Sequence, residues 1–324
     1  MTMVAKRMQR YKLLVKNLTT VETLGTVTVI CCEKTGTVTQ RRMVPTRIGF
    51  GDTEMEFDDL VSTCEAATVD ALDVAVRRVH ETAFLCNAAR FDPTSMHLPV
   101  NGRVVLGDAT DCALLRMAEH LCPLQPARRQ YNTLLTVPFN LRRRWMLAVC
   151  TDRTKSAQSP FMVAKGAPET LLPKCTQVQI QNGEIVPMDH TRRSRIEEMQ
   201  HRWAAQYGCR VLLLCRREYT ESNPLSGVAD SAELYAVACQ NMCELCVVGL
   251  VGLVDPPRDE ILDSVGKFRG AGIRVFMVTG DYAPTAAFVA RQCGIITSTT
   301  VDGIDEINAR VTVNKSEKRT DDIA

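Results

Sequence analysis

The sequence lacks a long unbroken run of apolar residues. A transmembrane helix needs about 20 mostly apolar residues, and the best candidate, at 245–253, stops at the Asp-Pro-Pro sequence of 255–257. The start, MTMVAKRMQRYKLL, is basic and amphipathic and does not contain the apolar core of a secretory signal peptide. We therefore expect no membrane-spanning segment and a cytoplasmic location for the chain as given.

The sequence also lacks an excess of either charge and a regular cysteine framework. Its 39 Lys and Arg residues nearly balance 37 Asp and Glu residues, which argues against a nucleic-acid or anionic-membrane partner. The 14 cysteines are scattered, as is typical of reduced thiols. Cys243 and Cys246 form one CxxC without the second pair of a zinc site, and we interpret both as core residues of a buried strand.

What the sequence does contain is typical of a globular protein with more than one domain. Hydrophobic residues make up 45% of the chain and charged residues 23%, which lies in the ordinary globular range. A length of 324 residues exceeds what one core usually needs. The sequence therefore predicts two domains.

The two ends of the chain carry the pattern of an α/β domain. A basic helical pattern precedes a strand predicted over 26–32. The later elements, in order, are an apolar strand at 247–254, a helix with apolar residues spaced over 261–268, a strand at 273–278 and a helix from Pro284 to Gly294. This alternation is typical of a parallel sheet with crossover helices, in which ligands bind at the carboxyl ends of strands.

The middle of the chain has a different pattern and is large enough for its own core. Amphipathic helices are predicted over 66–87, 111–121 and 192–206, between strands with polar alternation. We therefore predict that an α/β domain formed by 1–48 and 253–324 is interrupted by an inserted α+β domain at 49–252.

The stretch CCEKTGTVTQ at 31–40 places Glu33 at the end of the first predicted strand. A carboxylate at a strand end, next to Lys34 and the turn amides around Gly36, can receive a phosphoryl group or hold Mg²⁺. Thr35 adds a hydroxyl and a carbonyl oxygen at the same place, so Glu33 and Thr35 are the candidate metal ligands. The alternative is an ordinary solvated turn.

Three further stretches carry residues suited to phosphate chemistry. Lys165, in VAKGAPE, ends a predicted strand and is either a phosphate or adenine contact or an exposed lysine. Asp255-Pro256-Pro257-Arg258 is a predicted hinge, because the two prolines restrict the backbone around them. Thr279-Gly280-Asp281 offers a hydroxyl and a backbone amide at a second strand end, facing the first.

Taken together, these motifs resemble the cytoplasmic region of P-type ATPases. The stretches CCEKTGTVTQ, KGAPE, DPPR and VTGD occur in that order and spacing. The flanking stretches VKNLTTVETLG, GDATDCALL and VPFN are similar to the sodium/potassium and gastric proton/potassium ATPase α subunits. The similarity covers essentially the whole chain.

The resemblance implies a truncated, haloacid-dehalogenase-like (Rossmannoid) phosphorylation domain interrupted by an α+β nucleotide-binding domain. It implies that ATP is bound and that Glu33, Lys34 and Thr35 form the catalytic site with Thr279-Gly280-Asp281. Mg²⁺ is the implied cofactor. Its site is incomplete here, because the family's GDGVNDSP-type segment is not among the 324 residues.

The resemblance also implies a set of nucleotide contacts. At the base, adenine would stack on Phe139, and Asp111 would reach its polar edge. Lys165 and Gly166 would line the inner pocket. The phosphate contacts would be Arg210 and Arg144, the latter standing where a lysine is usual. Met146 replaces a glutamine of the family, so one polar contact to the base is in doubt; the alternatives are Phe139 as core and Arg210 as a surface charge.

One substitution bears directly on activity. The family's phosphorylated residue is an aspartate, and here it is Glu33. The extra methylene moves the carboxylate outward, and a displacement of about 1 Å can lower a rate roughly 100-fold.

Three hypotheses follow for the function. The first is an ATP-binding cytoplasmic fragment of a sodium/potassium-transporting α subunit with impaired or absent phosphorylation; family members lie in the plasma membrane with this region on the cytoplasmic side. The second is a slow enzyme whose missing parts come from another chain. The third is a non-catalytic, regulatory paralogue that docks on other subunits of a cation pump. A gene fragment without a selected role would have the same sequence.

Overall fold

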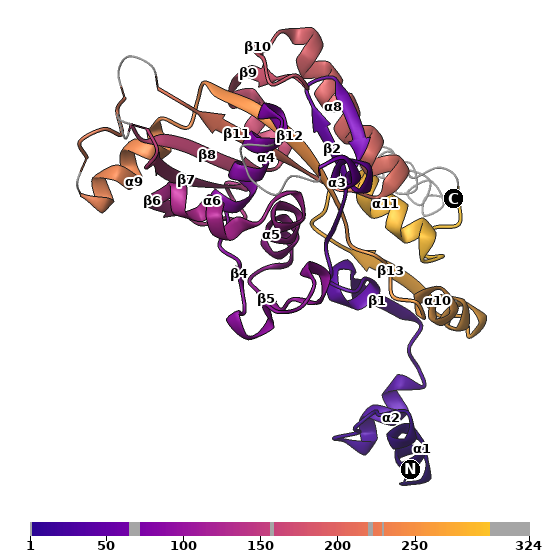
Figure 1. Cartoon of the computed structure of the whole chain (residues 1–324). Helices are drawn as coiled ribbons and strands as arrows, with labels where there is room; N and C mark the ends of the chain where they lie inside the picture. Colours follow the sequence, from indigo (N-terminus) through magenta and orange to yellow (C-terminus); the bar gives the residue numbers. More distant parts are fainter. Residues whose placement is uncertain (1, 65–71, 156–158, 220–222, 229, 299–324) are drawn as a thin grey trace. The chain divides into compact units, whose positions relative to one another are not determined.

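The computed structural model describes residues 2–64, 72–155, 159–219, 223–228 and 230–298. Figure 1 draws the chain with its helices and strands labelled. These residues belong to two compact units. Unit 1 comprises Met1–Cys32, Asp259–Val278 and Val289–Ala324, and unit 2 comprises Glu33–Arg258 and Thr279–Phe288. Both units are therefore assembled from segments that lie far apart in the sequence.

Unit 2 is built around a nine-stranded sheet. The main path has the order β10-β9-β12-β11-β8-β7-β6, and β2 joins it through β12 and carries β3. The strands are β2 (Val44–Phe50), β3 (Thr53–Glu56), β6 (Tyr131–Val137), β7 (Trp145–Asp152), β8 (Phe161–Gly166), β9 (Cys175–Gln179), β10 (Ile185–Pro187), β11 (Arg210–Arg217) and β12 (Leu245–Val254). A separate two-stranded sheet pairs β4 (Arg90–Phe91) with β5 (Val105–Leu106).

The sheet is antiparallel at every pairing except that of β9 with β12. The strand predicted at 247–254 is present as β12, but its expected place in a parallel sheet is wrong, because β12 runs antiparallel to β11 and β2. The reason is that any strand covered on both faces has a continuous apolar sequence, so its pattern does not distinguish a parallel sheet from an antiparallel one.

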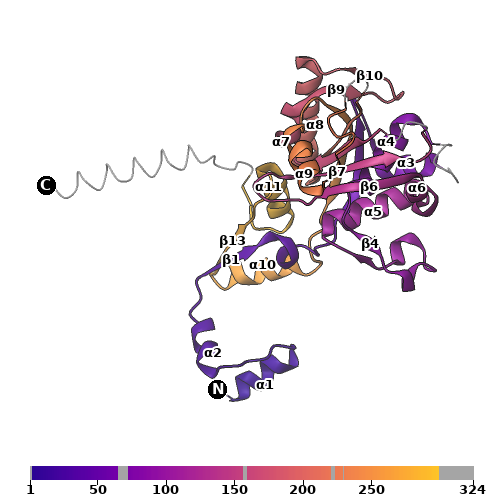
Figure 2. The same cartoon turned by 90° about the vertical axis from the view of Figure 1, so that its left-hand side faces the viewer.

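Helices cover both faces of this sheet (Figure 2). Along β7, Met146, Ala148 and Cys150 face one hydrophobic cluster, whereas the alternating residues Leu147 and Val149 face the other. The first cluster is completed by α3 (Phe57–Thr63), α4 (Val74–Leu85), α5 (Ala109–Leu121) and α6 (Leu124–Gln130), and the second by α7 (Pro168–Leu171), α8 (His190–Tyr207) and α9 (Ser231–Gln240). Short 3₁₀ turns occur at Pro93–Ser95, Val100–Gly102 and Leu172–Lys174.

Two of the helices predicted in the middle of the chain are confirmed almost to the residue, as α5 and α8. Their ends carry capping residues that the sequence displays. Asp189 accepts a hydrogen bond from the Arg192 amide at the start of α8, and Gly208, with φ +66°, ends it in a left-handed conformation. The helix predicted over 66–87 begins at Val74 instead, and 65–71 lie outside the described residues.

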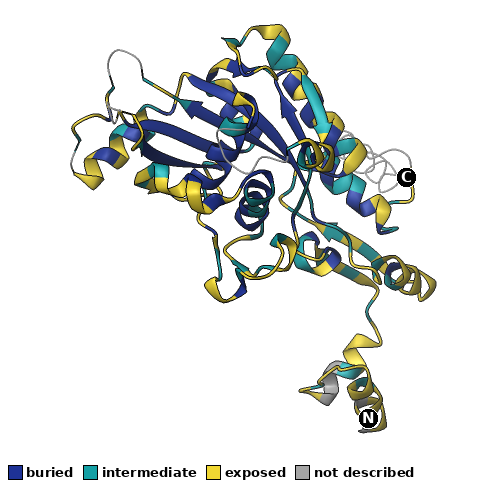
Figure 3. Cartoon of the chain, viewed as in Figure 1, coloured by how far each residue is buried: buried dark blue, intermediate teal, exposed yellow. Residues whose placement is uncertain are grey.

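Unit 1 contains a two-stranded sheet of β1 (Val29–Glu33) and β13 (Arg274–Val278), although Glu33, the last residue of β1, is counted with unit 2. The first predicted strand is thus confirmed with a later start than 26. Its helices are α1 (Thr2–Arg10), α2 (Leu18–Leu24) and α10 (Ile261–Gly270); α11 (Ala283–Gln292) begins in unit 2 and ends in unit 1. Figure 3 shows alternating exposure along both strands, and Phe276 and Val278 are exposed.

Within the described residues, no helix has the length and apolarity that a membrane crossing requires. All 14 cysteines have free thiols in this structure. Cys246 is buried in β12 as expected, but Cys243 is exposed, so its assignment to the core is wrong. It precedes Glu244, which adopts φ +50° just before the strand begins, and thus lies outside the sheet.

Candidate functional site

Unit 2 contains a cleft of about 790 Å³. This cleft is lined by all six residues that were predicted to contact a nucleotide: Asp111, Phe139, Arg144, Lys165, Gly166 and Arg210. Gly280 and Asp281, which were predicted as catalytic, line it as well. Residues from separate stretches of sequence are therefore brought to one place by the fold.

Phe139 lies in the loop between β6 and β7 and is 53% exposed. The loop is closed by hydrogen bonds from the Arg144 amide to the Asn140 carbonyl (2.7 Å) and from the Arg142 amide to the Asn140 side chain (2.8 Å). Arg144 adopts φ +55°, which turns the chain back into β7. The alternative of Phe139 as a core residue is thus wrong, and its ring is available to a planar ligand.

Asp111 and Lys165 form a buried ion pair at the inner end of the cleft. Asp111 lies in the first turn of α5, which Asp108 caps by accepting hydrogen bonds from the Thr110 and Asp111 amides. The second carboxylate oxygen of Asp111 accepts a hydrogen bond from the Ala88 amide at 2.9 Å. Lys165 is 4% exposed, so the alternative of a solvent-exposed lysine is wrong.

Gly166 has a steric role that the sequence does not display. A Cβ atom at this position would lie 2.5 Å from the Arg144 carbonyl oxygen and 2.8 Å from the Trp145 Cβ. Both contacts are shorter than real Cβ atoms make, and they come from the turn that carries Phe139 into β7. Glycine at 166 therefore permits the close approach of the two strands that form the floor of the cleft.

A second ion pair lies at the open side of the cleft. The Arg144 guanidinium is 3.3 Å from the Glu169 carboxylate, and the two side chains are 57% and 46% exposed. The other oxygen of Glu169 accepts a hydrogen bond from Gln200 at 3.2 Å. Because both groups are largely solvated, this pair adds little to stability.

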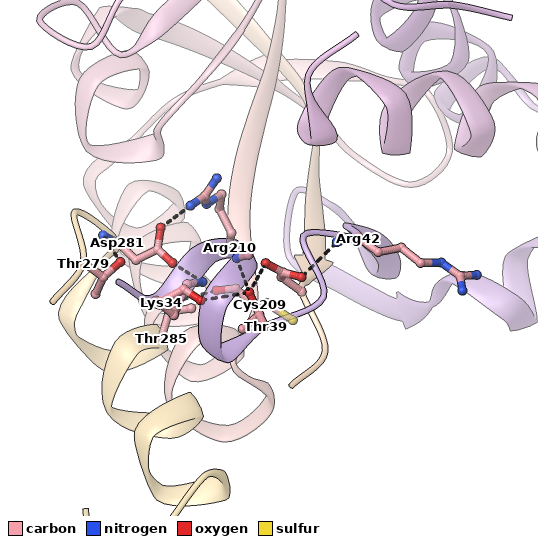
Figure 4. A network of polar contacts seen from close by, with 10 residues as sticks. Lys34, Thr39, Arg42, Cys209, Arg210, Thr279, Asp281 and Thr285 are labelled. Carbon is pink, nitrogen blue, oxygen red and sulfur yellow. Dashed lines mark hydrogen bonds and ion pairs between the residues drawn. The ribbon is translucent and has the colours of Figure 1, made fainter. Parts of the chain in front are cut away.

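A third charged group joins the cleft to the turn after β1 (Figure 4). Asp281 forms ion pairs with both Arg210 and Lys34, one through each carboxylate oxygen. Lys34 is 2% exposed and belongs to the irregular helical turn Lys34–Val38. Burial alone would raise the pKa of Asp281, but the Arg210 and Lys34 charges outweigh it and hold that pKa below its usual range.

The neighbouring contacts fix the positions of Arg210 and Asp281. The Thr285 hydroxyl donates a hydrogen bond to the Cys209 carbonyl at 2.8 Å, and the Asp281 amide donates to the Thr279 hydroxyl at 3.2 Å. The stretch after β1 and the Thr279-Gly280-Asp281 stretch, which were predicted to face each other, are therefore in contact through Lys34 and Asp281. Lys34 and Thr279 do not line the cleft.

The predicted hinge residues tie two chain segments together. Asp255 is buried and accepts hydrogen bonds from the Thr39 hydroxyl (2.5 Å) and the Arg42 amide (3.0 Å); Thr39 and Arg42 are labelled in Figure 4. The Pro256 carbonyl accepts a hydrogen bond from the Gln40 amide, and Thr39 bridges Pro257. Arg258 donates from its guanidinium to the carbonyl oxygens of Gly36 and Thr37. A hinge role for this junction stays a prediction.

Glu33 and Thr35, the predicted metal ligands, are not part of the cleft. Glu33 is exposed at the end of β1, and Thr35 is half-buried. Within the part of the chain that the structure describes, no three His, Cys, Asp or Glu side chains are grouped as a metal site. The fold thus brings Lys34, but not Glu33 or Thr35, into contact with a residue of the cleft lining.

Sequence reasoning missed several residues of the cleft. Asp108 could have been found, because an aspartate followed by Ala-Thr-Asp before an apolar run is a helix N-cap signature. Glu169 stands in the KGAPE stretch but was not assigned a role. Gln200 and Thr285 reach the cleft from α8 and α11 and carry no local signal.

Comparison with known proteins identifies the family of this chain. The family model described as P-type ATPase, cytoplasmic domain N, matches residues 75–260. This range includes most of α4, all of β12 and most of the cleft lining. The chain belongs to the P-type ATPase family.

Curated relatives are similar over almost the whole chain. It is 34% identical to the sodium/potassium-transporting ATPase subunit alpha-1 of Oreochromis mossambicus over 324 residues. It is 35% identical to subunit alpha-2 of Gallus gallus and 36% identical to subunit alpha-2 of Bos taurus. In each case the alignment covers 98% of this chain and 30% of the relative, so the chain spans less than a third of their length.

Proposed function

We propose that this chain binds ATP in the cleft of unit 2. The observation that carries the proposal is the joint presence of an exposed aromatic ring, Phe139, and three cationic side chains around a cleft of about 790 Å³. A cleft of this size matches the range of small-ligand sites. The family match over the same residues supports the choice of a nucleotide.

The cleft has a different chemistry at each part of the ligand. Stacking of a base on an aromatic side chain contributes about 1–3 kcal/mol, and Phe139 is exposed enough to provide it. Asp111 and Met146 lie at the inner end, and Arg210 and Arg144 are cations that can meet phosphates. Mg²⁺ would arrive bound to the phosphates, which supply most of its ligands in such sites.

We further propose that the two sequence ends, with β1 and β13, belong to a haloacid-dehalogenase-like scaffold on which phosphoryl transfer is impaired. Glu33 stands in the nucleophile position, and its carboxylate is exposed at the end of a narrow sheet. In-line transfer depends almost entirely on positioning. Because the relatives are named as sodium/potassium-transporting subunits, transport and association with other pump subunits are proposed for a protein that contains this region.

The binding proposal is tested by calorimetric titration of the full chain with ATP. We expect Phe139→Ala to weaken ATP binding about 10-fold, since the loss of a stacked ring is worth roughly 1–3 kcal/mol. Phe276→Ala is the matched control, because this ring is 48% exposed in β13 and does not line the cleft. Equal affinities for the wild type and Phe139→Ala would contradict the assignment of the cleft.

The proposal on phosphoryl transfer is tested by acid-stable labelling with γ-phosphate-labelled ATP and Mg²⁺. We expect no rapid incorporation into the wild type. Glu33→Asp restores the shorter side chain and is the informative variant, with Glu33→Gln as the unreactive control. Rapid labelling of the wild type that disappears in Glu33→Gln would show that the longer side chain is a competent acceptor.

A further inference from the structure

The cations of the cleft are all already engaged. Among the described residues that line it, four side chains are acidic and three are basic: Asp108, Asp111, Glu169 and Asp281 against Arg144, Lys165 and Arg210. Each of the three cations forms an ion pair with one of these carboxylates. A polyphosphate must therefore compete with a carboxylate for any cation that it meets, and the question is which pair can open.

The Lys165–Asp111 pair is the least able to open. Both side chains are 5% exposed, so separating them leaves a buried carboxylate without its counter-ion. The loss of one partner from a buried pair is strongly unfavourable. Asp111 would retain the Ala88 amide, which is a weaker partner than an ammonium group. We therefore regard this pair as a fixed part of the cleft.

The Arg144–Glu169 pair can open at almost no cost, but it also contributes little. Its two groups are 57% and 46% exposed, and water replaces either partner. Arg144 is consequently a general source of positive charge. It provides no mechanism by which ligand binding would be coupled to another part of unit 2.

Asp281 differs from both because it has two cationic partners. Arg210 is 35% exposed and reaches the cleft, whereas Lys34 is 2% exposed and does not line it. When Arg210 leaves, Asp281 keeps Lys34, so no buried carboxylate is left without a counter-ion. This arrangement removes the penalty that holds the Lys165–Asp111 pair together.

We propose that Asp281 is an internal anion that a nucleotide phosphate displaces from Arg210, and that Lys34 is the positioning residue that retains Asp281 during the exchange. The inference rests on the proposed binding of ATP in this cleft. It assigns Lys34 to nucleotide binding through Asp281. It also makes the turn after β1 sensitive to the phosphates, because the Lys34–Asp281 contact strengthens when Asp281 no longer shares its charge with Arg210.

The exchange predicts opposite effects for two substitutions, measured as the affinities of the full chain for ATP and for adenosine. Asp281→Asn removes the competing anion, and we expect ATP to bind about three- to tenfold more tightly. Lys34→Gln leaves Asp281 with Arg210 alone, and we expect ATP to bind more weakly by a similar factor. Adenosine has no phosphate, so its affinity should change in neither variant. Lys34→Arg keeps the charge and should restore the ATP affinity of the wild type.

A purely structural role for these residues would lower the affinity for both ligands in both variants, and that result would overturn the exchange. The exchange would also be overturned if Asp281→Asn bound ATP more weakly while its affinity for adenosine stayed the same. Asp281 would then contact the ligand itself. If the wild type bound neither ATP nor adenosine, the proposed function would fail before the exchange was tested.

Should a variant fail to fold, arginine side-chain ¹⁵N NMR on the wild type decides the same question. We expect the Arg210 Nε resonance to shift on addition of ATP and to stay in place on addition of adenosine. The Lys34 ammonium should remain protected from solvent in both cases. If the Arg210 Nε resonance does not shift when the protein is saturated with ATP, the proposal is contradicted.

Discussion

The two sheets of this protein differ in how much of them is covered. In the nine-stranded sheet of unit 2, strands such as β7 and β8 are buried along nearly their whole length, with a hydrophobic cluster on each face. In unit 1, β1 and β13 pair with each other and alternate between exposed and half-buried residues. A two-stranded sheet has little independent stability.

This difference separates two parts of the chemistry. The cleft is lined by residues from the wide sheet and its helices, so its shape is set by a well-packed core. Glu33 is the last residue of β1, and the two-stranded sheet that holds it is only partly buried. The proposed nucleotide binding and the proposed phosphoryl transfer would therefore depend on differently packed parts of the chain, so the first could persist without the second.

The largest effect is expected from an ion pair in the core of unit 2. Arg216 is 2.6 Å from Glu81 with both side chains 7% exposed, and the Tyr131 hydroxyl donates to the same carboxylate. Arg216→Gln should lower the free energy of unfolding by about 3–5 kcal/mol. Urea unfolding followed by tryptophan fluorescence measures this in unit 2, because both tryptophans, Trp145 and Trp203, belong to it.

Its control is the exposed pair in α10 of unit 1. Lys267 and Asp263 are 75% and 68% exposed, so Lys267→Gln should leave hydrogen exchange in α10 unchanged. If Lys267→Gln reduced the stability of α10 as much as Arg216→Gln reduced that of unit 2, the contrast between the units would be contradicted.

Glycine substitutions should have opposite signs in the two units. Gly166→Ala forces a Cβ against the Arg144 carbonyl and should destabilise unit 2 by roughly 1–3 kcal/mol. Gly266 lies inside α10, and a Cβ added there would meet no atom within 4 Å apart from its chain neighbours and the backbone of the helix itself, so Gly266→Ala should stabilise that helix by about 0.5–1 kcal/mol. Fluorescence-detected unfolding measures the effect of Gly166→Ala, and hydrogen exchange in α10 measures that of Gly266→Ala. If both substitutions changed stability in the same direction, the packing argument would be contradicted.

A further effect is expected as a pH dependence of unit 2. Burial lowers the pKa of His80, whose Nε2 lies 3.1 Å from the Cys122 carbonyl. The unfolded chain therefore takes up a proton first as the pH falls below about 6.5, and the unfolding free energy should drop by up to roughly 1.4 kcal/mol per pH unit until the folded pKa is reached. Burial also lowers the pKa of His120, so His80→Gln should remove the His80 part of this slope and leave the His120 part in place.

His97, which is exposed, provides the matched control, and His97→Gln should leave the slope in place. Unit 1 has no histidine in its segments, so its hydrogen exchange, corrected for the intrinsic rate, should not follow the same curve. A slope that is unchanged in His80→Gln would assign the effect to another group.

The sequence predicts the helices better than it predicts the sheet. The helices α5 and α8 carry an apolar period and capping residues within themselves, so their bounds can be derived locally. The pairing of β12 with β2, which lies some two hundred residues away, has no local signature. The candidate site shows the same division: Lys165 and Phe139 stand in recognisable motifs, whereas Gln200 enters the cleft through the packing of α8 on the sheet.

The amino-acid sequence by itself determined the positions of α5 and α8, the family and the residues whose chemistry suits a nucleotide, because caps, periodicity and motifs are local properties. The tertiary structure alone decided which charges meet. Lys165 forms a buried ion pair with Asp111, and Asp281 forms ion pairs with both Arg210 and Lys34. Both arrangements depend on how distant segments pack around one largely antiparallel sheet. Burial then sets the strength of each pair, and burial is a property of the folded chain rather than of any stretch of it.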